Sequence, residues 1–571
     1  ALDYRLDPAG RGVDSAVSPW METRFDTGNG TTLELGVDGV SDDWAYSVEF
    51  SGSDYHDREG GKDHEDRVFG LDAGDDEIPN TGYEELAGAL RLAYFGLTDH
   101  VLELDMGHSR QLDAPRPGGY YANSGEADRR YRYFDPQEFT YLHLRDKWQI
   151  GNDLLERLQT TLWWHQFGEE QFRSSIRDMG AATEHIRVRE YDDTLDAYGI
   201  DLQATTLLGA EDQHELTWGG TYIYETTDNS YRELQTPPGS TDPALLAPSG
   251  VSDWPNKTSV PDSSDYTTLG LFIQDDWQIT DAVSLLTGLR YSRYDWSFDN
   301  VEGNTDDVTG SLRGIWDVTA HHRLFAGISK GFRAPNLKNL AGTVDRGSSG
   351  VAAEGSADLE PETSYTYEAG WKWRKNRNSL AFTAFKTRIE DLIQRDYSLA
   401  DPEFANVEGA DLYGFEAAWD YGVNFTEIQR LALVGSVSMV DATRDIPVAG
   451  GTVEDNISRA NRLYGRCGLK YEHNRNWWGL FQMRWHDEYD DVATHSSNAD
   501  ADDIRLTVPG DPDGSMPGYA VLDLMGGWQS DDGKYRIGLF VENLADKTYR
   551  EPGSGADGVG RNFGVTAGVR F

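Results

Sequence analysis

Apolar residues recur at every second position in many short segments of this chain. The final segment shows the pattern without a break, because Phe563, Val565, Ala567, Val569 and Phe571 alternate with Asn562, Gly564, Thr566, Gly568 and Arg570. Such alternation is typical of a β-strand with one apolar face and one polar face. Because the alternation recurs along the chain, which ends on an aromatic residue inside a strand, it predicts a β-barrel of the outer-membrane type.

Short and long connections alternate between the predicted strands. Turn-forming residues mark tight connections, which we expect to face the periplasm, at Asn29-Gly30, Gly151 to Asp153, Lys375 to Asn378, Asn474 to Asn476 and Asp531 to Gly533. Longer polar connections, which we expect to be extracellular loops, lie near residues 56–81, 110–136, 230–264, 332–360, 396–405, 442–458 and 490–517. The sequence therefore predicts an all-β fold, a closed antiparallel transmembrane β-barrel of about 22 strands with short periplasmic turns and long extracellular loops.

The strand predicted at Tyr365 to Arg374 shows how the register is fixed. Its apolar face and its charged face alternate, with Tyr365, Tyr367, Ala369, Trp371 and Trp373 against Thr366, Glu368, Gly370, Lys372 and Arg374. A slip of one residue would move a Lys or Arg into the membrane at a cost of roughly 2–4 kcal/mol. In the similar strand from Tyr535 to Glu542, Phe540 alone breaks the polar phase.

The composition argues against a helical membrane protein and favours one large sheet. No run approaches the roughly 18 to 20 consecutive apolar residues of a spanning helix, and the mean hydropathy is −0.61. Aromatic residues make up 12% of the chain, which fits two girdles at the membrane interfaces. No linker separates domains, so we expect a connecting segment at residues 1–16 and a single barrel over residues 17–571. The single cysteine, Cys467, excludes an intrachain disulfide.

The chain is strongly acidic. It has 98 acidic and 51 basic residues, a net charge of −47, so nucleic acid is not an expected partner. Two interpretations of the charge stay open. The acids form a solvated surface suited to a salty or calcium-containing exterior, or they form an acidic vestibule that gathers cations by focusing the electric field.

Two sets of motifs resemble TonB-dependent outer-membrane receptors, and the resemblance extends from about residue 17 to the end of the chain. Residues 541–549 and 560–563 resemble the closing hairpin of that family, and the matched positions are Asn543, Leu544, Asp546, Tyr549 and the terminal Phe571. Residues 331–337 and 358–363 are similar to the paired motifs that flank one large extracellular loop, and the matched positions are Phe332, Arg333, Ala334, Pro335, Asp358, Leu359, Glu360, Pro361 and Glu362.

The resemblance implies a transporter of the bacterial outer membrane. Its expected substrate is a metal chelate of the siderophore type, or another large, scarce nutrient such as haem or cobalamin. Residues 336–357 contain no histidine, which argues against haem. The resemblance implies no covalent chemistry, so we expect neither an enzyme nor a required cofactor. The expected surroundings are outer-membrane lipid and lipopolysaccharide.

The family carries a globular plug and a TonB-binding segment ahead of the barrel. Strand signals begin here at Trp20, and Ala1 to Pro19 can supply only a connection. Three explanations stay open: the plug was removed or lies outside this sequence, a separate plug protein fills the lumen, or the barrel is an open pore or structural scaffold in a larger assembly. TonB is then a partner only through a plug.

One predicted loop interleaves aromatic rings with guanidinium groups. Its candidate ligand contacts are Tyr120, Tyr121, Arg129, Arg130, Tyr131, Arg132 and Tyr133. Such a surface could hold a planar anionic ligand by stacking and paired hydrogen bonds. The alternative is an interfacial belt whose arginines reach lipid headgroups or lipopolysaccharide. By resemblance, Arg333 is a further candidate contact.

Two clusters of candidate metal ligands lie in predicted loops. His56 and His64, among acidic neighbours, would suit a transition metal, and a second cluster offers oxygen donors that suit Ca²⁺, namely Asp500, Asp502, Asp503, Asp511 and Asp513. Neither cluster has an established metal-binding spacing. Solvated acidic loops are the alternative interpretation.

Overall fold

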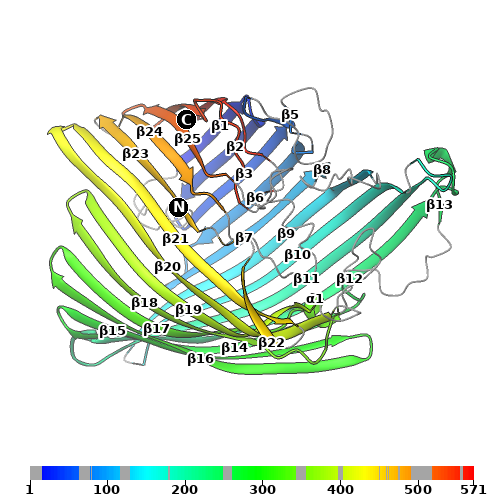
Figure 1. Cartoon of the computed structure of the whole chain (residues 1–571). Coiled ribbons are helices and arrows are strands. Elements are labelled where there is room, and N and C mark those ends of the chain that lie inside the picture. Colours follow the sequence, from blue (N-terminus) through cyan, green and yellow to red (C-terminus); the bar gives the residue numbers. More distant parts are fainter. Residues whose placement is uncertain are drawn as a thin grey trace.

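The computed structural model shows a closed β-barrel (Figure 1). It describes residues 16–62, 77–78, 80–115, 129–152, 154–177, 180–248, 260–341, 355–396, 403–448, 451–457, 460, 462–473, 476–489, 517–552, 554 and 557–571. The predicted all-β barrel of 22 strands is confirmed. Within the described part of the chain, no helix is long and apolar enough to cross a membrane.

The strands of the barrel follow one another around the wall in chain order. They are β1 (Ala16–Asp26), β2 (Gly30–Ser41), β3 (Trp44–Tyr55), β6 (Tyr83–Tyr94), β7 (His100–Leu112), β9 (Arg129–Asn152), β10 (Leu155–Arg177), β11 (His185–Leu208), β12 (His214–Gln235), β14 (Asp265–Thr280), β15 (Val283–Phe298), β16 (Val301–Thr319), β17 (His322–Arg333), β18 (Glu362–Lys375), β19 (Asn378–Asp396), β20 (Glu403–Thr426), β21 (Gln429–Val448), β23 (Leu463–His473), β24 (Trp477–His486), β25 (Tyr519–Gln529), β26 (Tyr535–Glu542) and β27 (Asn562–Arg570).

Shorter elements lie in the connections between the barrel strands. They are β4 (Arg58–Glu59), β5 (Glu77–Ile78), β8 (Ala114–Pro115), β13 (Ala247–Pro248), β22 (Gly451–Asn456), the helix α1 (Leu337–Ala341) and two 3₁₀ turns at Ala210–Asp212 and Pro243–Leu245.

The first and last strands close the cylinder. β1 pairs with β27 in antiparallel register from Trp20 opposite Arg570 to Asp26 opposite Gly564. Phe571 N also donates to Pro19 O at 2.9 Å. Closure gives every neighbouring strand a partner, which is the condition for placing a sheet in hydrocarbon.

The two ends of the barrel differ in their connections. At one end, consecutive strands are joined by short turns such as residues 42–43, 281–282 and 376–377, and the long connections lie at the other end. Short turns of this kind face the periplasm in outer-membrane barrels. The prediction that Asn29-Gly30 belongs to this end is wrong, because Gly28 N donates to Asn562 Oδ1 at 2.8 Å and His56 N to Asn29 O at 3.0 Å, both at the long-connection end.

The strands β9 to β12 are much longer than a membrane crossing. Each has 22 to 24 residues, whereas about 9 to 11 suffice to cross the bilayer. They therefore extend beyond the bilayer on the extracellular side. Figure 1 shows these long strands running toward β8 and β13. Parts of the predicted loops 110–136 and 230–264 are strand for this reason, since β9 already begins at Arg129 and β12 continues to Gln235.

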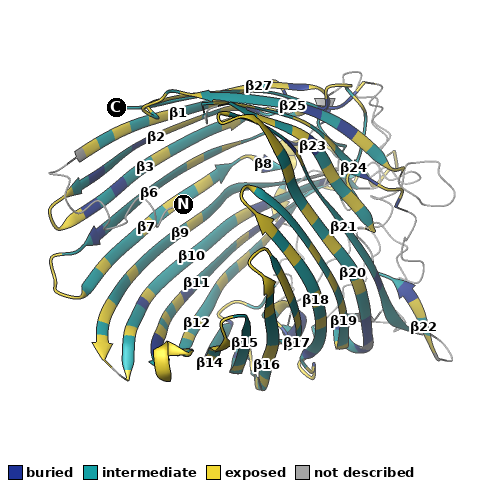
Figure 2. Ribbon diagram, turned by 90° about the vertical axis from the view of Figure 1, so that its left-hand side faces the viewer, coloured by how far each residue is buried: buried dark blue, intermediate teal, exposed yellow. Residues whose placement is uncertain are grey.

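The two faces of the wall follow the alternation of the sequence (Figure 2). On the outward face, large apolar side chains such as Phe50, Leu289 and Leu539 are about 60% exposed, at 62%, 60% and 62%. The opposite phase carries charges that pair across strands, as Arg570 with Asp38 at 2.9 Å. This separation places charged groups toward the lumen.

Phe540 shows that aromatic rings also line the lumen. The guanidinium carbon of Arg24 lies 4.9 Å from the centre of its ring. A Cβ atom at Gly564, on the neighbouring strand, would lie 1.9 Å from the ring. Glycine at this position therefore lets the ring lie flat on the inner wall, and the out-of-phase residue in β26 is not a lipid contact.

Adjacent substitutions in β3 test the assignment of the two faces. Phe50→Arg should destabilise the barrel by about 2–4 kcal/mol, because it places a charge at mid-strand on the outward face. Ser51→Arg is the matched control, since it points inward and its register partner is Glu34. Denaturant unfolding in phospholipid vesicles measures both. Equal destabilisation of the two variants would contradict the assignment.

Candidate functional site

An ion pair anchors the long connection between β17 and β18. Arg333, the last residue of β17, lies opposite Glu362, the first residue of β18, and Arg333 Nη1 pairs with Glu362 Oε1. The same carboxylate oxygen accepts a hydrogen bond from Ile393 N at 2.8 Å. Arg333 Nη2 also donates to Asn339 Oδ1 at 3.3 Å. One buried carboxylate thus fastens both ends of the connection to β19.

The start of this connection packs against the inner face of β14 and β15. Leu340 of α1 forms a buried apolar cluster with Trp296 and Phe298, and Tyr266 Oη donates to Pro335 O at 2.9 Å. Burial raises the pKa of Tyr266, which lies near the extracellular end of its strand. The hydroxyl, which is protonated at neutral pH, donates this bond and holds Pro335 in place.

The second half of the paired motif is fixed in a similar way. Leu359 is buried against Ile393 and Phe404. Glu360 N donates to Asn406 Oδ1 at 2.8 Å, and Asn406 Nδ2 returns a bond to Glu360 O at 2.7 Å. The remaining motif residues lie around these anchors: Phe332 is 5.8 Å from Tyr294 between ring centres, Ala334 and Pro361 are half-buried, and Asp358 is exposed.

The motif at the closing hairpin is a structural joint. Asn543 is 1% exposed, and its side chain bonds Lys547 N at 2.9 Å and Lys547 O at 2.7 Å. Its own amide donates to the fully buried carboxylate of Asp523 at 3.0 Å, which also pairs with Arg484 at 2.7 Å. Asp546 accepts from Arg561 N at 2.8 Å.

The other matched residues of that motif lie at the rim and along the seam of the barrel. Tyr549 packs on Tyr519 with 4.8 Å between ring centres, and Leu544 and Phe571 are exposed at 40% and 69%. The structure thus brings the C-terminal motif together as a closure of the barrel.

The aromatic and arginine segment lies high on the extracellular side. Tyr120 and Tyr121 lie outside the described residues, and only the backbone of Arg129, Arg130 and Tyr131 is described, as the start of β9. The Arg132 guanidinium lies 5.4 Å above the ring of Phe134, and Tyr133 stacks on Phe172 at 5.0 Å. These residues are some twenty positions from the periplasmic end of β9, well past the roughly 11 that cross the bilayer. That height is above the level of the phospholipid headgroups, and because Arg132 and Tyr133 are neighbours in one strand, their side chains lie on opposite faces of the wall. Both interpretations of the segment stay open.

The predicted metal clusters fall largely outside the described residues. This holds for His64, Asp500, Asp502, Asp503, Asp511 and Asp513. His56 Nε2 lies 3.2 Å from Thr27 O. It borders a cavity of about 250 Å³ that is also lined by Arg24, Asp26 and Arg58. Among the residues that the structure describes, no three His, Cys, Asp or Glu side chains converge on a metal position. Both metal sites stay predictions.

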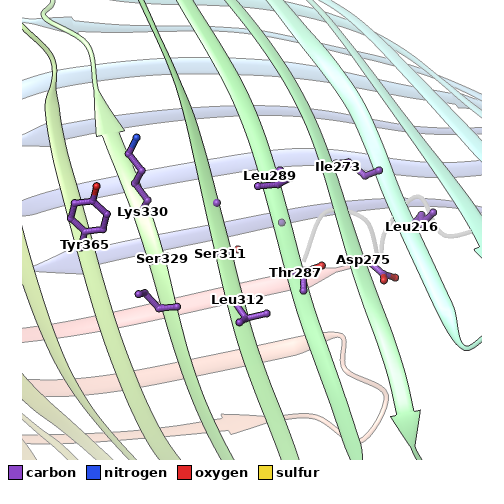
Figure 3. Close-up of a pocket in the computed structure, with 13 residues that line it drawn as sticks. Leu216, Ile273, Asp275, Thr287, Leu289, Ser311, Leu312, Ser329, Lys330 and Tyr365 are labelled. Carbon is purple, nitrogen blue, oxygen red and sulfur yellow. The ribbon is translucent and has the colours of Figure 1, made fainter.

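A larger hollow, of about 580 Å³, lies in the wall of β14 to β17 (Figure 3). It is lined by Ile273, Leu289 and Leu312 on the outward phase. Pairing of β16 with β17 ends at Ser311 opposite Ser329, so the strands separate beyond that point. Lys330 Nζ spans the gap, 2.6 Å from an oxygen of Asp307 and 3.3 Å from Val308 O. It thereby satisfies a carbonyl that the separation exposes.

Acidic side chains gather on the upper parts of β10 and β11. Asp193 lies opposite Glu169 in register, with Asp192 beside it in sequence. Burial, followed by repulsion from Glu169 and Asp192, raises the pKa of Asp193 to about 6. Such a concentration of like charge focuses a negative potential at the extracellular mouth.

These features define a class of protein: an outer-membrane β-barrel whose extracellular connections are anchored to the rim. Residues 94–544 match the family model described as TonB dependent receptor-like, beta-barrel. The chain belongs to this family, whose members are transporters of the bacterial outer membrane and not enzymes. The suspected resemblance is thus confirmed.

Individual relatives are distant. An iron-regulated outer membrane virulence protein of Vibrio cholerae is 26% identical over 248 residues, which are 40% of this chain and 36% of the relative. A probable TonB-dependent siderophore receptor of Acinetobacter baumannii is 26% identical over 132 residues, 21% of this chain and 17% of the relative. The matched region thus spans about a third, or less, of these curated relatives.

Solved structures show the same fold. The copper transporter OprC superposes with a TM-score of 0.75 at 16% identity, over 98% of this chain and 81% of that chain. The FrpB iron transporter of Neisseria meningitidis gives 0.71 at 16% identity, over 98% and 82%. The ferripyoverdine receptor of Pseudomonas aeruginosa gives 0.70 at 14% identity, over 97% and 72%.

Some residues of the site carry no signal in the sequence. Ile393 and Tyr266 become anchors only through contacts between segments that are far apart in the chain, whereas Asn339 lies six residues after Arg333 and contacts it locally. A carboxylate at the first residue of a predicted strand, as at Glu362, is a sequence pattern that could have indicated such an anchor.

The role of Glu362 as an anchor can be tested at a single amide. Glu362→Ala removes the acceptor of Ile393 N and the partner of Arg333, so the amide of Ile393 should exchange hydrogen at least about tenfold faster, equivalent to about 1.4 kcal/mol. Glu360→Ala, two residues earlier with an exposed side chain, is the control. Unchanged protection of Ile393 in Glu362→Ala would refute the anchor.

The raised pKa of Asp193 predicts a pH dependence. The folded state holds this proton more tightly than the unfolded state, so stability should be highest near pH 4, fall as the pH rises to about 6, and then level off. Asp193→Asn should remove this slope and stabilise the barrel at pH 7 by about 1–2 kcal/mol. Thermal unfolding from pH 4 to 7 measures it, with Asp228→Asn, an exposed carboxylate on β12, as control. An unchanged slope in Asp193→Asn would show that other groups titrate.

Proposed function

We propose that this barrel takes up a metal chelate of the siderophore type. The support comes first from the relatives, whose names refer to iron regulation, a siderophore, iron transport, ferripyoverdine and copper. The observation that carries the proposal is the anchored connection between β17 and β18, because its two motifs fasten both ends of a long extracellular connection to the rim of a wide barrel. A 22-stranded barrel is wide enough for a solute of that size.

The chemistry of the mouth fits a chelate better than a small ion. The guanidinium of Arg132 over the ring of Phe134, on one face of β9, can contact a large planar ligand. The acidic side chains of β10 and β11, including Glu169 and Asp193, lie on neighbouring strands. Their field favours neutral or cationic complexes over anionic ones.

Gating of such a wide lumen requires a plug. We propose that a segment outside the 571 residues, or a separate plug protein, supplies it and makes the contact with TonB. Outer-membrane lipid would cover the outward apolar phase, and lipopolysaccharide would contact the upper strands. Calcium bound by the acidic loops would screen repulsion there.

Uptake of radioactive iron tests the proposal. Cells that lack their own siderophore receptors and produce this barrel together with its plug should accumulate ⁵⁵Fe from a suitable ferric chelate at least about tenfold above a vector control, because energised uptake concentrates its substrate. The accumulation should disappear in an isogenic strain without TonB. Iron uptake that persists without TonB would contradict energised transport.

Planar bilayers distinguish the competing function. Large, constant single-channel conductance of the purified protein together with TonB-independent entry of small solutes would indicate an open pore or scaffold. The absence of measurable conductance would indicate an obstructed lumen. Mass spectrometry of co-purifying chains then identifies a separate plug.

A further inference from the structure

The cavity of about 250 Å³ lies at the extracellular end of β1, β3 and β6. Tyr55 of β3 is opposite Tyr83 of β6 in register, and their ring centres are 4.8 Å apart. Tyr55 is five positions from the outward-facing Phe50, so its side chain points to the lumen. Arg24 of β1 is on the same face, because its guanidinium lies over the lumenal ring of Phe540. The inner wall of the barrel therefore forms one side of this cavity.

The connection between β3 and β6 forms the other side. Its two ends are cross-linked, because the Asp57 carboxylate accepts hydrogen bonds from Thr81 N and Gly82 N, both at 2.7 Å. Arg58 N also donates to Thr81 Oγ1 at 2.8 Å. Arg58 and Thr81 both line the cavity. The backbone that carries the Arg58 side chain is thus held in place beside the wall.

The acid that lines the cavity already has protein partners. Asp26 has a side chain that is 3% exposed, and it accepts hydrogen bonds from Arg24 Nε at 2.9 Å and from Asn29 Nδ2 at 3.0 Å. Glu85, two positions along β6 from Tyr83, accepts a bond from Gln111 at 3.0 Å. The bond to Asp26 also fixes the position of the Arg24 side chain.

Hydrogen-bond donors are in surplus around the cavity. Within the part of the chain that the structure describes, the Nη groups of Arg24 and the guanidinium of Arg58 have no acceptor. The charge of Arg58 acts on the Tyr83 hydroxyl, which places the guanidinium near the wall. Two arginines against Asp26 leave a positive charge here, in a chain whose net charge is −47. His56, which also lines the cavity, can only add to that positive charge.

We infer that this cavity binds a compact oxyanion with two or more negative charges, such as phosphate or a short polycarboxylate, between Arg24 and Arg58. Guanidinium groups present paired N–H donors that match the oxygens of phosphate and carboxylate groups. The volume of about 250 Å³ is below the roughly 300–1,000 Å³ of sites for drug-sized molecules. A small anion therefore fits this cavity better than a whole chelate.

The attraction at this cavity is local. The net charge of the molecule repels anions, and so do the acids around Asp193 on β10 and β11. Binding of an anion should therefore depend strongly on Arg24 and on Arg58. Both side chains are exposed, so solvent screens their charge and the affinity is modest. The inference does not rest on the proposed uptake of a chelate, because it concerns a free anion on the inner wall.

Isothermal titration calorimetry of the purified chain with inorganic phosphate, and separately with citrate, tests the site at constant ionic strength in chloride. At least one of the two anions should bind saturably, one per barrel, with a dissociation constant on the order of 1 mM or lower. Arg24→Gln and Arg58→Gln should each weaken this binding at least about tenfold. Tighter binding of phosphate would assign the site to a tetrahedral ion, and tighter binding of citrate would assign it to carboxylates.

Arg232→Gln provides the matched control. Arg232 is an exposed arginine on the extracellular part of β12 and pairs with Glu190, so its loss removes one positive charge outside the cavity and should leave binding unchanged. Arg58→Lys keeps the charge without the paired donors and should bind more tightly than Arg58→Gln. Heat-modified mobility on gels verifies that each variant is folded.

Two results would overturn the site. One is the absence of saturable binding of either anion by the unmodified protein. The other is equal weakening in Arg232→Gln and Arg58→Gln, which would show a general attraction by surface charge.

Discussion

The structure depends on one constraint, which is that a backbone amide in hydrocarbon must find its partner within the protein. The pairing of β1 with β27 meets this condition for the last open edges. Side chains support the same seam from the lumen, because Arg536 pairs with Glu22 at 3.1 Å and Arg570 with Asp38 at 2.9 Å. Once the sheet is closed, side chains on every strand point alternately to lipid and to the lumen, and the period of two in the sequence follows.

The same constraint applies at the rim of the barrel, where strands end and backbone amides have no neighbouring strand to bond. Carboxylates of the chain then act as acceptors. Asp57 accepts from Asn80 N, Thr81 N and Gly82 N at 2.7 to 3.2 Å, and Glu362 and Asp523 do the same for single amides. Part of the large negative charge is therefore structural, since these acids terminate strands and fasten connections. The acids around Asp193 differ from these, because Asp193 and Glu169 lie opposite each other in the middle of a strand pair and repel.

Sequence reasoning predicted the closed barrel, its strand number and its family because alternation and local motifs are properties of neighbouring residues. It placed the Asn29-Gly30 turn at the wrong end of the barrel. A short connection indicates a tight turn, but its residues do not show at which of the two ends the turn lies. It also took the upper parts of β9 and β12 as loops, because strands above the membrane lose the apolar phase. The inward position of Phe540 and the contact between His143 and His165 could not be predicted, since they depend on which residues register places side by side.

Register links these observations. The imidazoles of His143 on β9 and His165 on β10, 22 positions apart in the chain, meet on the inner wall with 2.7 Å between their Nε2 atoms. A slip of one residue between the two strands would turn one imidazole outward. The same slip would move Arg145 to the outward face, at a cost of roughly 2–4 kcal/mol near mid-membrane. The charged residues of the lumen therefore also fix the register of β9 with β10, because they are excluded from lipid. This register brings the two imidazoles together. The separation of apolar from charged side chains that places the barrel in lipid thus also determines which side chains meet on its inner wall.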